Sequence, residues 1–264
     1  MKKTFLPVLT AALLAGASHA QAQILISEIN SNGIGGDFFE IYNAGSSAVD
    51  LGGWKWVDNA KVTDGGPSFN GARAYAFNAF TLNAGSSALV VSDAGGGASG
   101  NTAFATSWGI ANSNLLTFTV PTAPTGTGNG LGQNDLVALF NSTGSFVTGL
   151  NYGTTAATIT QGDSSTVSLL PFLRSAGGTS AGGHAGIAGG GVATDSLVWN
   201  YWGSTAENPT YFSTSTVGFA GAFANATTST TIGSPGVVPE PSSTALLGLG
   251  TIALLGLRRL NRKA

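Results

Sequence analysis

Two acidic side chains in successive apolar segments of this 264-residue chain could do chemistry together. Glu28 follows an apolar run that begins at Ile24, and Glu40 follows Phe38-Phe39, so the two segments predict neighbouring strands. Glycoside hydrolysis requires two carboxyl groups about 5–9.5 Å apart across a cleft. The alternative role is structural, because carboxylates at strand edges accept hydrogen bonds from nearby donors.

His184 is the candidate proton shuttle, since the other histidine, His19, lies in the N-terminal segment. His184 lies in the glycine-rich segment Gly182-Gly183-His184-Ala185-Gly186, and Asp163 or Asp195 could complete a Ser-His-Asp arrangement with it. A histidine in a glycine-rich loop is more often a solvated surface residue. We therefore predict no catalytic residue, and an enzyme would require His184, Asp163 and Asp195 to converge in a cleft.

Metal and sugar binding have weaker support. Asp58, Asp64 and Asp93 lie in turn-like segments, where aspartate commonly bonds the local backbone. Calcium needs about six to eight oxygen ligands, and the chain has no Asp-x-Asp-x-Asp loop and no cysteine. We predict no metal site and no cofactor, with a calcium site assembled from several acidic loops as the alternative. Tryptophans exposed in a row could stack on sugar rings, but burial in a core is the default for Trp54, Trp56, Trp108, Trp199 and Trp202.

Composition and charge exclude a nucleic-acid-binding protein. Only 8% of the residues are charged, against about 25% in an average soluble domain. Between residues 24 and 236 the chain has four basic and eleven acidic residues, a net charge of −7. Four scattered cations cannot neutralise a phosphate backbone. Short apolar runs between Gly, Ser, Thr and Asn instead predict an all-β protein with many tight turns.

The N-terminus has the pattern of a secretory signal peptide. Two lysines follow Met1, an apolar run covers residues 5–17, and small residues continue to Ala22. We predict a signal helix within residues 1–22, cleaved after Ala20 or Ala22 during export by the Sec machinery.

The C-terminal segment, residues 237–264, has three parts. Val238-Pro239-Glu240-Pro241 precedes an apolar stretch over residues 244–257, and a basic cluster follows at Arg258, Arg259, Arg262 and Lys263. That stretch would form a helix of roughly 21 Å, shorter than a hydrocarbon core of about 30 Å, with its basic end cytoplasmic. The arrangement resembles the PEP-CTERM sorting signal of Gram-negative bacteria. This implies transient membrane insertion, recognition by an exosortase and cleavage near Pro239-Glu240-Pro241; a simple membrane anchor is the alternative.

The central part predicts a sandwich or barrel, because strand-like runs recur at roughly 8–12-residue spacing with turn signals between them. Trp54 and Trp56 should share one face of a strand. No helical period is apparent between the two terminal segments. The predicted strands cover residues 24–29, 38–42, 49–51, 54–57, 74–80, 88–91, 115–120, 135–140, 145–150 and 196–202.

Three blocks in this region, residues 26–30, 37–43 and 49–54, resemble the opening of a lamin tail domain. A later strand-turn-strand over residues 134–152 and the closing Ser234-Pro235-Gly236 also fit that family. The resemblance implies an immunoglobulin-like β-sandwich over residues 23–236 and favours a structural role for both glutamates. The residues that carry its motif are Glu28, Glu40, Asn43, Leu51, Gly53 and Trp54.

The chain departs from compact members of that family in its loops. Residues 58–80 and 92–132 are longer than needed, and residues 153–233 contain several glycine clusters that predict a flexible insertion. The hexapeptide at residues 43–48 recurs at residues 83–88. It marks either paired binding loops or the same turn chemistry used twice, with Asn and Gly supplying positive φ.

The sequence thus predicts a non-enzymatic protein, secreted or displayed at the surface of a Gram-negative cell. Its predicted partners are the Sec machinery and an exosortase, with extracellular polysaccharide as a candidate ligand and no nucleic acid. The sorting resemblance implies a contribution to extracellular matrix or biofilm through adhesion. An extracellular hydrolase, a calcium-dependent binding module and a partner docked on an exposed sheet edge are the alternatives.

Overall fold

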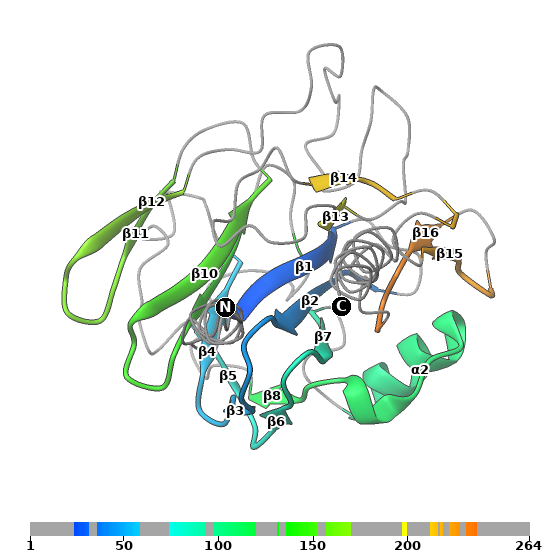
Figure 1. Ribbon diagram of the computed structural model, residues 1–264, viewed down its shortest axis with the longest axis horizontal. Helices are drawn as coiled ribbons and strands as arrows, with labels where there is room; N and C mark the ends of the chain where they lie inside the picture. Colours follow the sequence, from blue (N-terminus) through cyan, green and yellow to red (C-terminus); the bar gives the residue numbers. More distant parts are fainter. Residues whose placement is uncertain are drawn as a thin grey trace, which may run out of the picture.

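The computed structural model describes residues 24–31, 36–58, 74–92, 98–119, 131, 136–152, 157–169, 197–199, 212–215, 217–218, 222–227 and 231–236, with 197–199 and 212–214 as backbone only. Most of these residues form strands (Figure 1). The two predicted terminal helices lie outside them.

The elements follow one another as labelled in Figure 1. They are β1 (Ile24–Asn30), β2 (Phe38–Asn43), β3 (Val49–Asp50), β4 (Lys55–Val57), β5 (Tyr75–Phe77), β6 (Thr81–Leu82), β7 (Ser87–Val91), α2 (Ala98–Trp108), the 3-10 helix η2 (Asn112–Asn114), β8 (Phe118–Thr119), β9 (Leu136–Phe140), β10 (Phe146–Asn151), β11 (Ala157–Thr160), β12 (Thr166–Leu169), β13 (Leu197–Trp199), β14 (Phe212–Thr214), β15 (Phe223–Ala224) and β16 (Ile232–Gly233).

Two five-stranded antiparallel sheets form the domain. One has the order β14-β13-β1-β2-β7 and the other β10-β9-β4-β5-β8. In the first sheet β1 lies between β13 and β2, and β2 lies between β1 and β7, so both strands are interior. Every residue of β1 and β2 is buried. The fold is therefore an all-β, immunoglobulin-like sandwich, as predicted.

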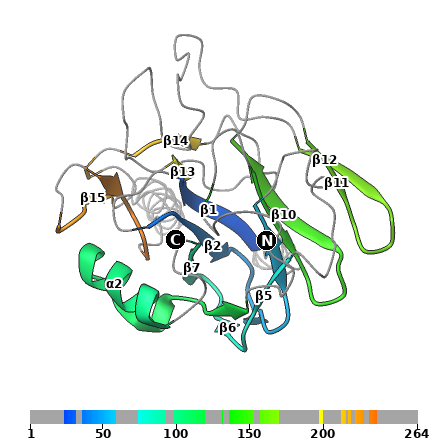
Figure 2. The ribbon, with the colours of Figure 1, turned by 180° about the vertical axis from the view of Figure 1, so that it is seen from behind.

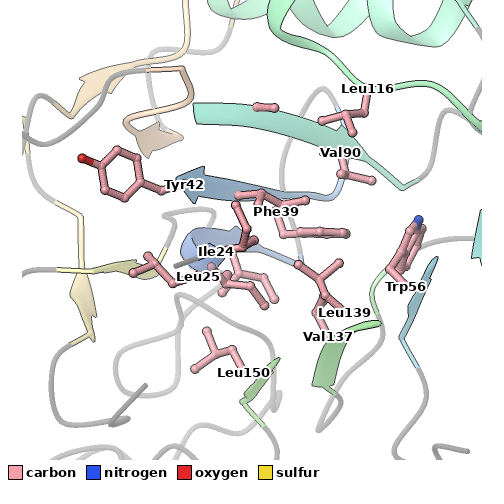
Figure 3. Packing of buried hydrophobic residues seen from close by; sticks show 14 of the residues in the cluster. Ile24, Leu25, Phe39, Tyr42, Trp56, Val90, Leu116, Val137, Leu139 and Leu150 are labelled. Atoms are coloured by element: carbon pink, nitrogen blue, oxygen red, sulfur yellow. The ribbon is translucent and has the colours of Figure 1, made fainter. Parts of the chain in front are cut away.

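The main core lies between the two sheets. Phe39 of β2 faces Val137 and Leu139 of β9, and Trp56 of β4 closes one side of the cluster (Figure 3). Trp56 stacks on Tyr75 at 4.3 Å between ring centroids and meets Phe39 edge-on. Aromatic pairs of this kind each add about 0.5–1.5 kcal/mol to the area they bury. The two sheets are thus held together by ring packing as well as by aliphatic contacts.

A helix was not predicted within the sandwich, and α2 corrects that expectation. Phe104, Ala105 and Trp108 of α2 are buried against Phe38 and Leu89 at the β7 side of the first sheet. Because only three turns carry this apolar face, the helical period is too short to stand out in the sequence. The strand predicted over residues 115–120 shrinks to β8, because Leu115 forms only an isolated bridge to Leu89 before the ladder begins at Phe118.

The expectation of a flexible insertion over residues 153–233 also needs correction. Its first part forms the hairpin β11–β12, which continues outward from β10 (Figure 1; Figure 2 shows it from behind). Ala157 and Ile159 are buried beside Phe140 and thereby attach the hairpin to the sandwich. The glycine clusters at residues 177–191 lie outside the described residues.

The repeated hexapeptide forms two loops that bond each other. The Asn43 backbone N–H donates to the Ser86 carbonyl, and the Gly85 N–H donates to the Asn43 carbonyl. Gly85 has φ +68, the left-handed conformation predicted for this turn. In the first copy the Asn43 side chain instead accepts from the Gly45 N–H at 3.0 Å. The two copies thus use the same residues in different turn geometries.

Candidate functional site

The two glutamates singled out in the sequence face each other across the centre of the first sheet. Glu28 of β1 is the direct register partner of Glu40 of β2, and a β-bulge lies between Ile26 and Glu28. Glu28 is 0% exposed and Glu40 is 1% exposed. A bulge increases local twist and redirects a side chain, so two carboxylates can sit inside a strand pair whose other residues are mostly apolar.

Each carboxylate accepts hydrogen bonds from a segment that follows about 200 residues later in the sequence. Glu28 Oε1 accepts from the Ser234 backbone N–H at 2.9 Å, and Glu28 Oε2 accepts from the Ser234 hydroxyl at 3.0 Å. Glu40 Oε2 accepts from the Gly236 N–H at 2.7 Å, while its Oε1 accepts from the Ser27 hydroxyl at 2.6 Å. We call Ser234-Pro235-Gly236 the latch. The carboxylates hold it from the interior of the sheet, not from a strand edge.

The environment of the pair favours the protonated form of Glu40. The pKa of Glu40 is raised from 4.5 to about 8, chiefly because burial removes water from the carboxylate and secondly because Glu28 faces it. Hydrogen bonds from Ser27, Gly236 and Ser87 oppose that rise but do not cancel it. A hydrolase needs its carboxyls open to a sugar and a water, whereas this pair is closed over by protein. Its geometry suits holding a chain segment rather than reaction.

The remaining motif residues shape the loops around this sheet. Asn43 donates through Nδ2 to the carbonyls of Ser47 and Leu82 at 2.8 and 3.0 Å. Leu51 is fully buried in the core, and Gly53 has φ +75, which a side chain would strain. Trp54 packs half-buried against the same cluster that contains Trp56, in agreement with the predicted shared face.

The tryptophans do not form an exposed row among the described residues. Trp56 is 0% exposed and Trp108 is 2% exposed, both inside hydrophobic clusters. Only the backbone of Trp199 is described, in β13, and Trp202 lies outside the described residues. Stacking of sugar rings on Trp56 or Trp108 would therefore require the core to open.

A second polar cluster lies at the surface of the domain, whereas the glutamate pair is buried. The turn between β9 and β10, residues 141–145, lies beside the turn between β11 and β12, residues 161–165 (Figure 1). The Gly162 N–H donates to the Gly144 carbonyl at 3.0 Å, and the Phe146 N–H donates to Gln161 Oε1 at 2.7 Å. We call these two bonded turns the twin-turn tip. It presents mainly hydroxyl and amide groups to solvent.

Internal hydrogen bonds fix the side chains of the twin-turn tip. Asn141 Oδ1 accepts from the Thr143 N–H, the Thr143 hydroxyl and the Ser145 N–H. Asp163 Oδ1 accepts in the same way from the Ser165 N–H and hydroxyl, at 2.9 and 2.6 Å. The Ser165 hydroxyl bond is the largest cause of the lowered pKa of Asp163.

The two turns share one backbone pattern, and they differ at its strained position. Gly144 has φ +88 in the first turn, and Ser164 has φ +68 in the second. In each turn the N–H of that residue donates to the carbonyl three residues earlier, of Asn141 or Gln161. A serine held at positive φ is uncommon, and such strain often accompanies functional loops.

The described part of the structure does not bring together the other candidate catalytic and metal-ligating residues. Asp163 lies on the twin-turn tip, and Asp58 follows β4, whereas His184, Asp195, Asp64 and Asp93 lie outside the described residues, as do Val238 to Pro241 and the basic cluster. Among the residues that are described, no group of three His, Cys, Asp or Glu side chains could hold a metal ion.

The fold and its closing segment define a class: an immunoglobulin-like β-sandwich joined directly to a C-terminal sorting segment. The family model of the lamin tail domain matches residues 17–154, just over half of the chain, and that of the PEP-CTERM protein-sorting motif matches residues 237–263. The chain therefore belongs to the lamin tail domain family. No curated protein matches it significantly.

The sorting motif has a direct consequence for cell biology. It marks the chain as exported, processed by an exosortase and extracellular or associated with the surface. Lamin tail and PEP-CTERM domains are non-catalytic types. In the described part of the chain, no helix combines the length and hydropathy needed to cross a membrane.

Sequence reasoning found the two glutamates but missed the twin-turn tip and the residues that contact the pair. Asn141-Ser142-Thr143-Gly144-Ser145 is a strong turn signal, and Gln161 to Ser165 is a weaker one without glycine at its strained position. Their adjacency depends on the hairpin β11–β12, which the sequence predicts as part of a flexible insertion. The tip could be recognised only after that hairpin was placed.

Proposed function

We propose that this protein is a non-enzymatic module of the extracellular matrix of a Gram-negative cell, which contacts neutral polysaccharide through the twin-turn tip. Residues 1–22 would direct export through the Sec machinery, and residues 23–236 would be the displayed domain. Residues 237–264 would insert transiently, through 244–257, and be cut near Pro239-Glu240-Pro241. Val238, Arg258, Arg259, Arg262 and Lys263 would complete the signal that the exosortase reads.

The observation that carries the proposal is the fixed, hydroxyl-rich surface of the twin-turn tip. Ser142, Thr143, Ser165 and neighbouring residues are exposed, and Asp163 is the one charged residue in the two turns. Their internal hydrogen bonds reduce the entropy lost when a ligand is bound. A surface of donors and acceptors with a single charge suits hydroxylated polymers better than highly charged partners.

The expected affinity of a single domain is low. A neutral hydrogen bond contributes about 0.5–1.5 kcal/mol net, so a few of them give weak binding. Many copies displayed on one surface and many sugar units in one polymer raise the apparent affinity by avidity. Adhesion in a matrix requires only this kind of weak, repeated contact.

Binding of the exported protein to immobilised neutral polysaccharide from its host tests the proposal. The double variant S142K/S164K adds long side chains to both turns and should lower retention at least about tenfold. The control Ser113→Lys makes one such change on the exposed 3-10 helix η2, which contacts α2 on the side of the domain away from β11 and β12 (Figure 2), and should leave retention unchanged. Equal loss in both variants, or no retention of the native protein, would reject the tip as a sugar-binding site.

Two further arms separate the alternative functions. Retention abolished by EDTA and restored by Ca²⁺ would favour a calcium-dependent module. Shortening of the polysaccharide during incubation would favour a hydrolase. We expect retention without calcium and polymer of unchanged length.

A further inference from the structure

The latch lies immediately before the sorting motif. Gly236 is the last residue that the structure describes, and the motif match begins at residue 237. Glu28 and Glu40 hold the latch by bonds that span 206 and 196 residues of sequence. The N-terminal strand pair therefore fixes the point at which the sorting segment leaves the domain.

Chain length then limits how far the sorting segment can extend from that point. Pro239 is three residues beyond Gly236, a reach of at most about 11 Å. The apolar stretch begins at Thr244, eight residues beyond Gly236, a reach of at most about 29 Å. A protease that binds an extended chain on both sides of the scissile bond would meet the folded domain while the latch is closed.

We propose that the latch is a brake on exosortase processing: while Ser234 and Gly236 are bound to the two glutamates, the cleavage motif lies too close to the domain for rapid cleavage, and opening of the latch admits the enzyme. Opening frees three residues, which adds up to about 11 Å of reach. The next upstream attachment, the pairing of Gly233 with Phe223 between β16 and β15, stays in place. The domain thus sets the rate of its own processing without contributing to the chemistry.

The substitution Gly236→Ala weakens the latch selectively. Gly236 has φ +76, and a methyl group there would meet only Leu89 Cδ1 at 3.8 Å, an ordinary contact. The substitution therefore adds left-handed backbone strain without a clash. Gly109→Ala is the matched control, because Gly109 has φ +68 and open space but lies at the end of α2.

The experiment is a pulse-chase of the full chain in its host, with precursor and processed forms separated by mass. Gly236→Ala should speed processing about fivefold or more, the factor that left-handed strain corresponds to, whereas Gly109→Ala should leave the rate unchanged. Insertion of Gly-Ser-Gly-Ser-Gly-Ser after Gly236 lengthens the tether with the latch intact. It should also speed processing and remove the further effect of Gly236→Ala.

Each other outcome overturns the brake. Slower processing of Gly236→Ala would mean that the closed latch presents the motif. Equal acceleration by both alanine variants would assign the effect to general destabilisation, and thermal unfolding of the two exported variants would reveal it. An unchanged rate in the insertion variant, or absence of a processed native form, would show that the distance between the domain and the motif does not limit cleavage. Polysaccharide retention is a separate readout, so its failure would leave this inference intact.

Discussion

The latch and the twin-turn tip are both polar clusters built on hairpin strands, but they differ in burial and in sequence range. The latch joins residues about 200 positions apart inside the fold, and its glutamates are almost fully buried. Most bonds of the tip join residues two to four positions apart at the surface. Water can replace partners lost from the exposed bonds of the tip, whereas it does not reach Glu28, Glu40 or Ser234 in the latch.

This difference separates stability from recognition. A buried donor without an acceptor costs about 1–3 kcal/mol, so the latch should dominate the energetics. An exposed network costs little when broken, but its order determines what the surface can bind. The two clusters should therefore respond in opposite ways to substitution.

The largest expected effect is that of Glu28→Ala. It removes the acceptor of both the Ser234 N–H and the Ser234 hydroxyl, so the free energy of unfolding should fall by about 4 kcal/mol. Chemical denaturation of the exported domain measures the change. The matched control Asp163→Ala, which also deprives a serine N–H and hydroxyl of their acceptor, should cost little because those donors are exposed. Similar losses at both sites would contradict the contrast.

A pH dependence of stability should follow from Glu40. Its pKa is about 8 in the folded protein against 4.5 ordinarily, so between these values the folded state keeps a proton that the unfolded state has released. The free energy of unfolding should therefore fall as pH rises from about 4.5 to about 8 and should level off above that. Thermal unfolding across this range measures the slope.

The isosteric variant Glu40→Gln assigns this slope to one group. Without the titrating carboxyl, the stability curve should be nearly flat over the same range. Glu28 is the acidic group that faces Glu40, and it remains in the variant. A slope that survives Glu40→Gln would place the titration elsewhere in the domain.

A smaller loss, about 2 kcal/mol, is expected for Gly149→Ala in β10. A Cβ there would lie 2.9 Å from the Val137 carbonyl oxygen and 2.8 Å from Leu169 Cδ1 of β12. Because the carbonyl belongs to a paired strand, it cannot move away, and overpacking of this kind typically costs about 1–3 kcal/mol. Denaturation measures the loss, and hydrogen exchange should show the hairpin β11–β12 opening before the rest of the domain. Uniform exchange would indicate that Gly149→Ala introduces no local strain between β10 and the hairpin β11–β12.

The sequence was most informative where interactions are local. Apolar bursts between turn formers predicted β1, β2, β7, β9 and β10 to within about two residues, because alternation and turn chemistry act over a few positions. The helix α2 was missed because the apolar part of its buried face has only three residues. The hairpin β11–β12 was missed because its short, hydroxyl-rich strands have the composition of a loop.

The candidate site follows the same rule. Glu28 and Glu40 could be paired from adjacent strand-like segments, but their bonds to Ser234 and Gly236 depend on where the chain returns after about 200 residues. The closing Ser234-Pro235-Gly236 was anticipated only through family resemblance. The direction of the Glu40 pKa shift could not be predicted either, since it depends on complete burial between interior strands.

The smallest predicted effect tests the contrast between the latch and the twin-turn tip at the tip itself. Ser164→Gly at the twin-turn tip should stabilise the domain by up to about 1 kcal/mol, because glycine adopts φ +68 without the strain that serine carries. The extra freedom of glycine in the unfolded chain offsets part of this gain. Thermal unfolding measures stability, and polysaccharide retention of the same variant measures function. A gain in stability with weaker retention would show that the strain at Ser164 contributes to polysaccharide binding. Unchanged retention would show that the strain lowers stability without contributing to binding.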